Sequence, residues 1–230
     1  MSVRCGVLGL VLLVVGLAPA GQPSASPLYS LPPDGTWVEY TWTARGPDGQ
    51  EQSGTLRISS VGRTERQGAP HRWVEFKLEA KAGERTQTKL RKLLIPESAF
   101  AGGRSPLGAA VEAYAQNRPG GPVTRLTPAQ VNDFLGLGIG PSGVPIRSVG
   151  EHEEVETELG RFITRRVTAV GPAGERTLEY HGWLTARVPF GWAKFAILER
   201  SGPQTHTLFT ATARRTGSGA RSELDHSQAR

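Results

Sequence analysis

Cysteine is nearly absent from this sequence, which excludes several kinds of chemistry. The single cysteine, Cys5, lies ahead of an uncharged run of valine, leucine and glycine over residues 6–17. A lone cysteine forms no internal disulfide, and beyond this run the chain offers neither a thiol nucleophile nor a thiolate metal ligand. The domain that follows must therefore be stabilised by an ordinary hydrophobic core, for which about 200 residues are enough.

A hydrophobic run long enough to cross a bilayer is also missing. As a helix, residues 6–17 would reach about 18 Å, whereas the hydrocarbon core of a bilayer is roughly 30 Å thick. Arg4 before the run and the small residues Ala18 and Ala20 at its end are typical of a cleavable secretory signal peptide. We expect residues 1–20 to be removed on export and no transmembrane segment to remain. The mature protein would then lie in the periplasm or outside the cell.

No block of five or six like charges occurs in the chain. It has 27 Lys and Arg against 21 Asp and Glu, a formal net charge of +6, and the basic residues alternate with acidic ones. This dispersed pattern predicts a solvated surface of mixed charge and no nucleic-acid partner. Weak attraction to anionic membrane surfaces remains open.

Alternation of apolar and other residues with a period of two begins at residue 36 and predicts β-strands. In residues 36–44, Val38, Tyr40 and Trp42 occupy one face. Similar runs cover residues 54–61, 72–80, 86–95, 153–159, 161–170, 176–184, 192–199 and 205–214. Short strands separated by glycine and proline turns favour antiparallel pairing. We expect a mainly β fold with minor α, a single curled antiparallel sheet or incomplete barrel.

Composition also sets the expected boundaries. Residues 21–34 are rich in proline and serine and predict an extended lead-in, and residues 35–215 predict a single antiparallel β domain. A helical, glycine-rich insertion is expected at about residues 100–149, placed over one face of the sheet. Residues 216–230 are expected to be a disordered polar tail.

Two short helices are predicted within the insertion. Leu107, Val111 and Tyr114 have helical spacing, and Thr127 followed by Pro128 is typical of a helix start. The apolar face of the second helix would carry Val131, Phe134 and Leu135. Two interpretations stay open for this segment, a lid over the sheet and a plain insertion.

Four short segments carry a resemblance to a known family: Gly35–Tyr40 (GTWVEY), Lys92–Pro96 (KLLIP), Val188–Gly191 (VPFG) and Gly217–Ser222 (GSGARS). In this order they resemble uncharacterised exported bacterial proteins that are similar to the LolA/LolB-type lipoprotein-binding fold. The resemblance implies a curled antiparallel sheet with helices over an apolar cavity, and a lipid or lipoprotein as partner. It brings no catalytic residues and no cofactor.

Motifs for hydrolysis or metal binding are not found. Neither H-E-x-x-H nor Gly-x-Ser-x-Gly occurs, and the histidines lie far apart in the sequence: His71, His152, His181, His206 and His226. The acidic run at residues 151–158 has two readings, a weak cation site and cross-strand ion pairs. The ion pairs, with Arg161, Arg165 and Arg166, are favoured because one strand rarely supplies converging metal ligands. We expect no catalytic residue and no metal.

Aromatic residues are the remaining candidates for a ligand site. Trp37 and Trp73 fall on the polar faces of their predicted strands, where they would either line a groove for an apolar ligand or pack beneath other segments. Trp183, Trp192 and Phe134 complete this candidate site.

Three functional hypotheses result. The first is an exported, non-enzymatic protein that holds a lipid or another apolar ligand on the concave face of the sheet. A face filled by the chain's own side chains would argue against it. The second is an envelope-associated structural or protein-interaction module without a ligand. The third and least favoured is a hydrolase.

Overall fold

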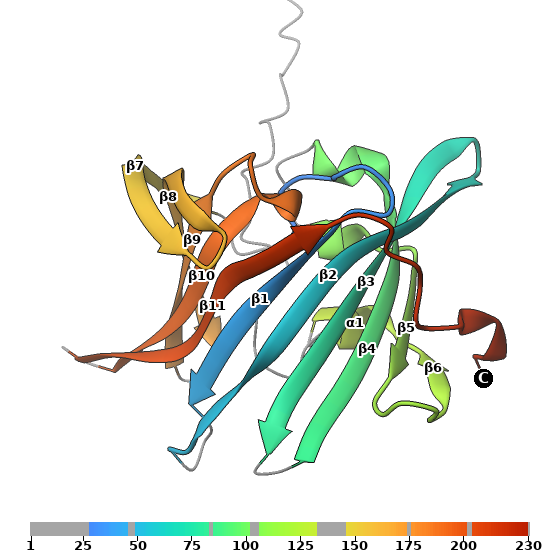
Figure 1. The fold of residues 1–230 in the computed structure, drawn as a ribbon, viewed down its shortest axis with the longest axis horizontal. Coiled ribbons are helices and arrows are strands. Elements are labelled where there is room, and N and C mark those ends of the chain that lie inside the picture. Colours follow the sequence, from blue (N-terminus) through green and yellow to red (C-terminus); the bar gives the residue numbers. More distant parts are fainter. Residues whose placement is uncertain are drawn as a thin grey trace, which may run out of the picture.

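A single antiparallel sheet of eleven strands makes up most of the molecule (Figure 1). The computed structural model describes residues 28–45, 49–82, 85–101, 106–132, 146–173, 176–201 and 204–229. The expected signal peptide, residues 1–20, lies outside the described residues. The spatial order is β6-β5-β4-β3-β2-β1-β11-β10-β9-β8-β7, and β6 and β7, at its two ends, do not pair with each other to close a barrel.

The sheet consists of two meanders joined along their first and last strands. The first contains β1 (Trp37–Arg45), β2 (Glu51–Arg66), β3 (Ala69–Ala82), β4 (Arg85–Pro96), β5 (Glu112–Gln116) and β6 (Val123–Arg125). The second contains β7 (Ile146–Thr157), β8 (Gly160–Ala173), β9 (Arg176–Leu184), β10 (Trp192–Ser201) and β11 (Gln204–Gly217). Antiparallel pairing of β1 with β11 unites them. The predicted mainly β, antiparallel, unclosed sheet is confirmed.

The hydrophobic core lies on one face of this sheet, called here the inner face. Alternation places Val38, Tyr40 and Trp42 of β1 in the core, where they are fully buried. Trp42 stacks on Phe209 of β11 with ring centroids 5.9 Å apart. The largest fully buried side chains of the inner face are Tyr40, Trp42, Leu56, Ile58, Phe76, Leu93, Ile95, Phe190 and Phe209. These side chains of the described strands form one continuous core on the inner face.

The middle segment differs from the predicted pair of helices. Residues Pro106–Ala109 form a 3-10 turn, η2, and the expected helix over Leu107 to Tyr114 is wrong because the chain enters strand β5 at Glu112. Pairing with β4 gives this strand backbone partners, and it buries Ala113 in the core and Tyr114 on the opposite face. A stripe of three residues is too weak a helical signal to outweigh such tertiary pairing.

The second predicted helix begins where expected. Helix α1 (Pro128–Asn132) follows Thr127, whose hydroxyl accepts a hydrogen bond from the Gln130 amide while the Gln130 side chain accepts one from the Thr127 amide. This reciprocal arrangement is a capping box. Val131 packs in the core on the inner face, whereas Phe134 and Leu135 lie outside the described residues.

The chain end also differs from expectation. The disordered polar tail predicted for residues 216–230 is wrong for residues 216–229, which the structure describes up to a final 3-10 turn, η4 (His226–Gln228). Leu224 is 1% exposed and packs on the outer face of the sheet with Trp73 and Tyr114. The order has a physical cause, since the buried carboxylate of Glu75 accepts backbone hydrogen bonds from this segment.

Candidate functional site

The described part of the lead-in, residues 28–34, packs against the turn between β9 and β10. Leu28 is buried in the core, and the amides of Tyr29 and Ser30 donate to the carbonyl of Phe190 at 3.0 and 3.3 Å. Phe190 belongs to the 3-10 turn η3 (Pro189–Gly191), where its φ of 62° is rare for a residue with a side chain. This turn anchors the lead-in through the Phe190 carbonyl.

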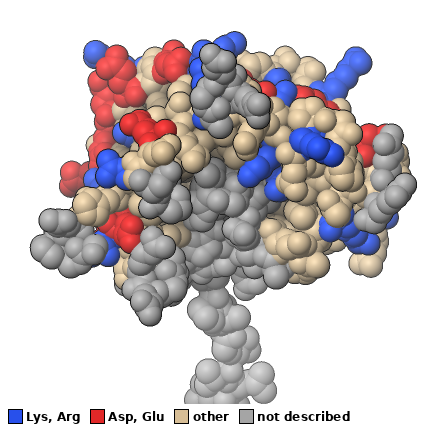
Figure 2. All heavy atoms as spheres, turned by 90° about the horizontal axis from the view of Figure 1, so that it is seen from below, with Lys and Arg blue, Asp and Glu red and all other residues tan. Residues whose placement is uncertain are grey.

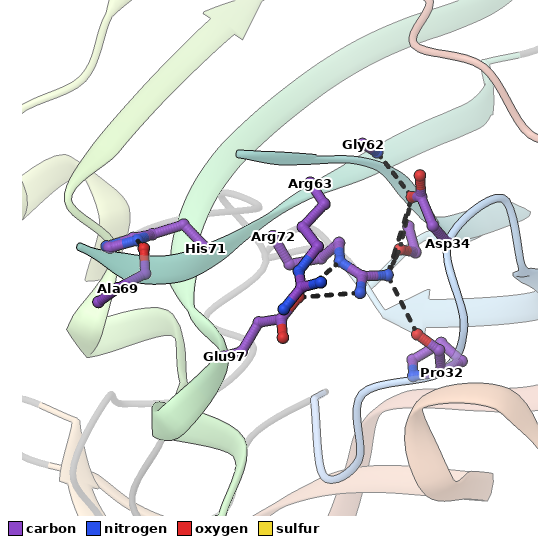
Figure 3. Close-up of polar contacts among 9 residues, drawn as sticks. Pro32, Asp34, Gly62, Arg63, Ala69, His71, Arg72 and Glu97 are labelled. Carbon is purple, nitrogen blue, oxygen red and sulfur yellow. Dashed lines mark hydrogen bonds and ion pairs between the residues drawn. The ribbon is translucent and has the colours of Figure 1, made fainter. Parts of the chain in front are cut away.

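A buried arginine fixes the other end of the lead-in (Figure 3). Arg72 of β3 donates from Nη1 to the Pro32 carbonyl at 3.4 Å and to the Ser60 hydroxyl at 2.9 Å. Its Nη2 donates to Glu97 at 2.9 Å, and Asp34 lies 3.8 Å from Nη1. Because this guanidinium is buried, its hydrogen bonds are needed to offset its desolvation.

Asp34 adds a second attachment to the strand β2. Its Oδ1 accepts from the Gly62 amide at 2.7 Å and from the Ser60 hydroxyl at 3.2 Å. The lead-in is therefore held at both ends, by the Phe190 carbonyl and by the Arg72 network. Pro32 and Pro33, next to the network, form part of a cleft wall.

A cleft of about 710 Å³ lies between the lead-in, β8 and the β9–β10 turn, and we call it the rim cleft. Its volume is within the range of about 300–1,000 Å³ that is usual for small-molecule sites. Leu184 and Val188 line it and also belong to the core, so its floor is rigid. The lining residues are Tyr29, Ser30, Leu31, Pro32, Pro33, Thr36, His152, Ile163, Arg165, Leu184, Thr185, Ala186, Arg187, Val188, Pro189 and Gly191.

The rim cleft combines apolar walls with positive charge. Ile163 is 61% exposed, and it and Tyr29 are two of the three exposed large hydrophobic side chains found among the described residues. Arg165 donates to the Tyr29 hydroxyl at 2.9 Å, and Arg187 lies over the Phe162 ring at 5.2 Å. No described lining residue is an aspartate or glutamate.

A histidine adds a third nitrogen group to this wall. His152 of β7 pairs in register with Arg165 of β8, which places the two side chains on the same face of the sheet. The rim cleft can therefore accommodate an apolar group and a negative charge together.

The structure does not bring the predicted tryptophans together in this cleft. Arg57 lies over Trp37, with its Cζ 4.1 Å from the centroid of the tryptophan ring. The rings of Trp73 and His226 pack together with their centroids 4.6 Å apart. Trp183 donates from Nε1 to Glu153 at 2.8 Å. Trp192 is buried in the core, although it contacts Tyr29 edge to face at 6.3 Å. Phe134 lies outside the described residues.

The acidic run behaves largely as an ion-pairing surface. Arg161 pairs with Glu154 at 3.5 Å and Arg166 with Glu153 at 3.4 Å, which confirms two of the expected cross-strand pairs. Arg165 instead lines the rim cleft. Figure 2 shows acidic side chains concentrated toward the left, the side on which β7 and β8 lie in Figure 1, with basic ones among them and dispersed over the rest of the face. Within the described ranges, no cluster of three potential metal ligands occurs.

Sequence reasoning missed the residues of the rim cleft. Phe162 and Ile163 are adjacent apolar residues in a predicted strand, so one of them had to face outward, and this signal was available. No local sequence signal pointed to Arg165 and Arg187 as neighbours. They come together only through the pairing of β8 with β9 and the turn that follows β9.

Comparisons with known proteins identify no family. No family model matches the sequence, and no curated protein matches it. Two crystal structures align with 83% of this chain, a "putative exported protein with YmcC-like fold" from Bacteroides fragilis and a "putative lipoprotein" from Parabacteroides distasonis. Their TM-scores are 0.42 and 0.41, their identities 8% and 7%, and the alignments cover 99% and 98% of those chains.

Likeness at this level assigns no function, and the resemblance to LolA/LolB-type proteins stays a prediction. None of the helices in the described part of the chain has the length and apolar character needed to span a bilayer.

Proposed function

We propose that this protein is an exported, non-enzymatic binding protein whose ligand is a small amphipathic anion of the fatty-acid type, held in the rim cleft. One observation carries the proposal. The cleft joins apolar walls to two guanidinium groups, and no carboxylate lies among its described lining residues.

The charge balance supports an anionic head group. Arg165 has a neutral partner, the Tyr29 hydroxyl, and the charge of Arg187 faces an aromatic ring. Neither guanidinium pairs with a carboxylate in the described part of the chain. Guanidinium groups bind carboxylates and phosphates through paired hydrogen bonds, so both are suited to an incoming anion.

The apolar walls support a hydrocarbon tail. Leu31, Ile163 and Val188 line the cleft, and an exposed side chain such as Ile163 gains free energy when a ligand covers it. The proposed site is at the rim of the sheet, because the described cleft that joins apolar walls to arginines lies there.

The proposal is non-enzymatic because no catalytic pair is assembled in the cleft. Ser30 and His152 both line it, but no hydrogen bond joins His152 to a hydroxyl among the described residues. A nucleophile activated by a histidine would need that contact.

Binding of cis-parinaric acid tests the proposal, because this fatty acid becomes fluorescent in an apolar site. We expect saturable binding to the purified protein and at least tenfold weaker binding of its uncharged methyl ester. Arg165→Gln combined with Arg187→Gln should weaken binding of the acid by at least tenfold, about 1.4 kcal/mol, and leave the ester unaffected.

Arg161→Gln is the matched control. Arg161 lies on the same strand but pairs with Glu154 outside the cleft, so affinity for the acid should not change. Equal affinity for acid and ester would contradict the anionic head group. If neither compound binds, the proposed fatty-acid type of ligand is excluded and a protein-interaction module is favoured.

A further inference from the structure

The C-terminal segment, residues 218–229, lies on the outer face of the sheet in the manner of a bound peptide. It follows β11 and reaches the surface of β3, β4, β5 and β6, which carries the apolar residues Trp73, Leu90, Leu94, Tyr114 and Val123. We call this surface the outer groove. Leu224 is the segment's apolar anchor there.

Two buried charges in the outer groove bind the backbone of the segment. Glu75 is 4% exposed, and its carboxylate accepts from the amides of Glu223 and Leu224 at 2.9 and 3.0 Å. Lys92 is 5% exposed, pairs in register with Glu75 and donates to the Leu224 carbonyl at 3.2 Å. These contacts use groups that every peptide possesses, so they recognise a chain rather than a particular side chain.

Side-chain recognition comes from two positions of the segment, spaced two residues apart. Leu224 fills the apolar part of the groove. The His226 ring lies 4.6 Å from that of Trp73 and 5.2 Å from that of Tyr114, and its Nδ1 is 3.1 Å from Nζ of Lys92. The groove therefore selects leucine and histidine in the pattern Leu-x-His.

The connection of the segment to the sheet is slight by comparison. Ser218, Gly219 and Arg221 are exposed, and the Ala220 amide donates to the Gly35 carbonyl at 2.8 Å. Nearer the groove, the exposed pair of Lys77 and Glu223 adds a contact at 2.9 Å that contributes little in water. None of these contacts is a backbone hydrogen bond of a strand pair.

We propose that the outer groove is a peptide-binding site, filled in cis by the chain's own C-terminal segment, and that a partner's chain segment with a Leu-x-His pattern displaces it. The buried Glu75 and Lys92 bind the peptide backbone. The apolar surface around Leu224 and the aromatic rings around His226 supply specificity for the side chains. This site lies on the face opposite the core and is independent of the rim cleft.

The test uses the full chain with its own segment dislodged. Leu224→Asp places a carboxylate beside Glu75 and should empty the groove. A fluorescent peptide of residues 218–229 should then bind this variant at least tenfold more tightly than it binds the wild type, where the cis segment competes. The same peptide with Leu224→Ala or His226→Ala should bind at least tenfold more weakly, and Glu75→Gln in the protein should weaken binding similarly.

Further outcomes decide the proposal. Reciprocal exchange of segments between two copies, seen as dimers in sedimentation, would support the site, because a second copy supplies the same peptide. A folded Leu224→Asp variant that binds no peptide would overturn it. If that variant fails to fold, hydrogen exchange of the wild type decides. Glu223 and Leu224 amides that exchange much faster than those of β3 and β4 support a displaceable segment, and equal rates overturn it.

Discussion

The Tyr29 hydroxyl accepts a hydrogen bond of 2.9 Å from Nη2 of Arg165 and thereby joins the lead-in to β8, two walls of the rim cleft. This contact orients the guanidinium without neutralising it, because a phenol at ordinary pH carries no charge. A polar contact therefore joins two walls of the cleft, and the positive charge of Arg165 is not neutralised by it.

A carboxylate added to the cleft should abolish binding of an anion. Ile163→Asp replaces an exposed side chain, so we expect a change in unfolding free energy within about 0.5 kcal/mol and a loss of cis-parinaric acid binding of more than tenfold. Fluorescence titration and thermal denaturation would measure the two effects.

The matched control for this change is Val111→Asp. Val111 is also an exposed apolar residue, at 50%, but it does not line the rim cleft. Its substitution should leave the affinity unchanged. Equal losses in the two variants would indicate a nonspecific effect of added negative charge and would contradict the cleft as the site.

Two arginines that share one carboxylate should differ strongly in their contribution to stability. Arg72 and Arg63 both contact Glu97, at 2.9 and 3.1 Å, but Arg72 is buried and Arg63 is exposed. Arg72→Met should lower the free energy of unfolding by about 2–3 kcal/mol, since it removes charged hydrogen bonds to Glu97, Ser60 and Pro32.

Arg63→Met should lower the free energy of unfolding by less than about 1 kcal/mol, as is usual for an exposed ion pair. Chemical denaturation would compare the two variants. Similar losses would mean that the Arg72 network does not fix the lead-in as described. A loosened lead-in should also weaken ligand binding in Arg72→Met alone.

Local patterning predicted the strands because the two faces of each strand meet different surroundings. Val38, Tyr40 and Trp42 alternate with residues that face outward, and this period of two is visible without any knowledge of the partner strands. Glycine and proline turns then limit how neighbouring strands can pair, which favours antiparallel meanders.

The candidate sites depend on long-range pairing and were not visible locally. Leu224 is an isolated apolar residue in a polar tail, and its burial requires Glu75, 149 positions earlier in the chain. Tyr29 and Arg165 are 136 positions apart. Tyr114 fits a helical stripe in the sequence, yet its strand forms because β4 offers backbone partners.

A glycine that accommodates a tryptophan should not tolerate a methyl group. A Cβ at Gly182 of β9 would overlap the ring of Trp192 on the neighbouring strand β10. Because the ring is buried and has little freedom to move, Gly182→Ala should lower the free energy of unfolding by about 1–3 kcal/mol.

Gly150→Ala provides the comparison for this substitution. A Cβ at Gly150 of β7 would lie 3.5 Å from Cβ of Arg166, which is an ordinary contact. The free energy of unfolding of this variant should therefore be within about 0.5 kcal/mol of the wild-type value. Thermal denaturation measures both. A neutral Gly182→Ala would show that Trp192 can repack, and that the β9–β10 surface is less tightly packed than described.

Acid should loosen the outer groove through His226. Its pKa is lowered from the usual value of 6.5, chiefly by burial between the rings of Trp73 and Tyr114 and then by the charge of Lys92. Of the other charges that face the ring, Arg66 also lowers the pKa, while Glu112 and Asp225 raise it. The bound position therefore favours the neutral imidazole over the protonated one.

The sign of the pH effect follows from this lowered pKa. The unfolded chain takes up the proton first as the pH falls, so the stabilisation by His226 is complete above pH 6.5 and is lost progressively below it. His226→Phe keeps an aromatic ring in the slot and cannot titrate. The fall in melting temperature between pH 7.5 and 5.5 should be smaller in this variant than in the wild type.

His206→Phe is the control, because His206 is exposed and does not belong to the outer groove. This variant should lose as much stability on acidification as the wild type does. Should all three proteins show the same fall in melting temperature, His226 would not be the group that couples the outer groove to pH.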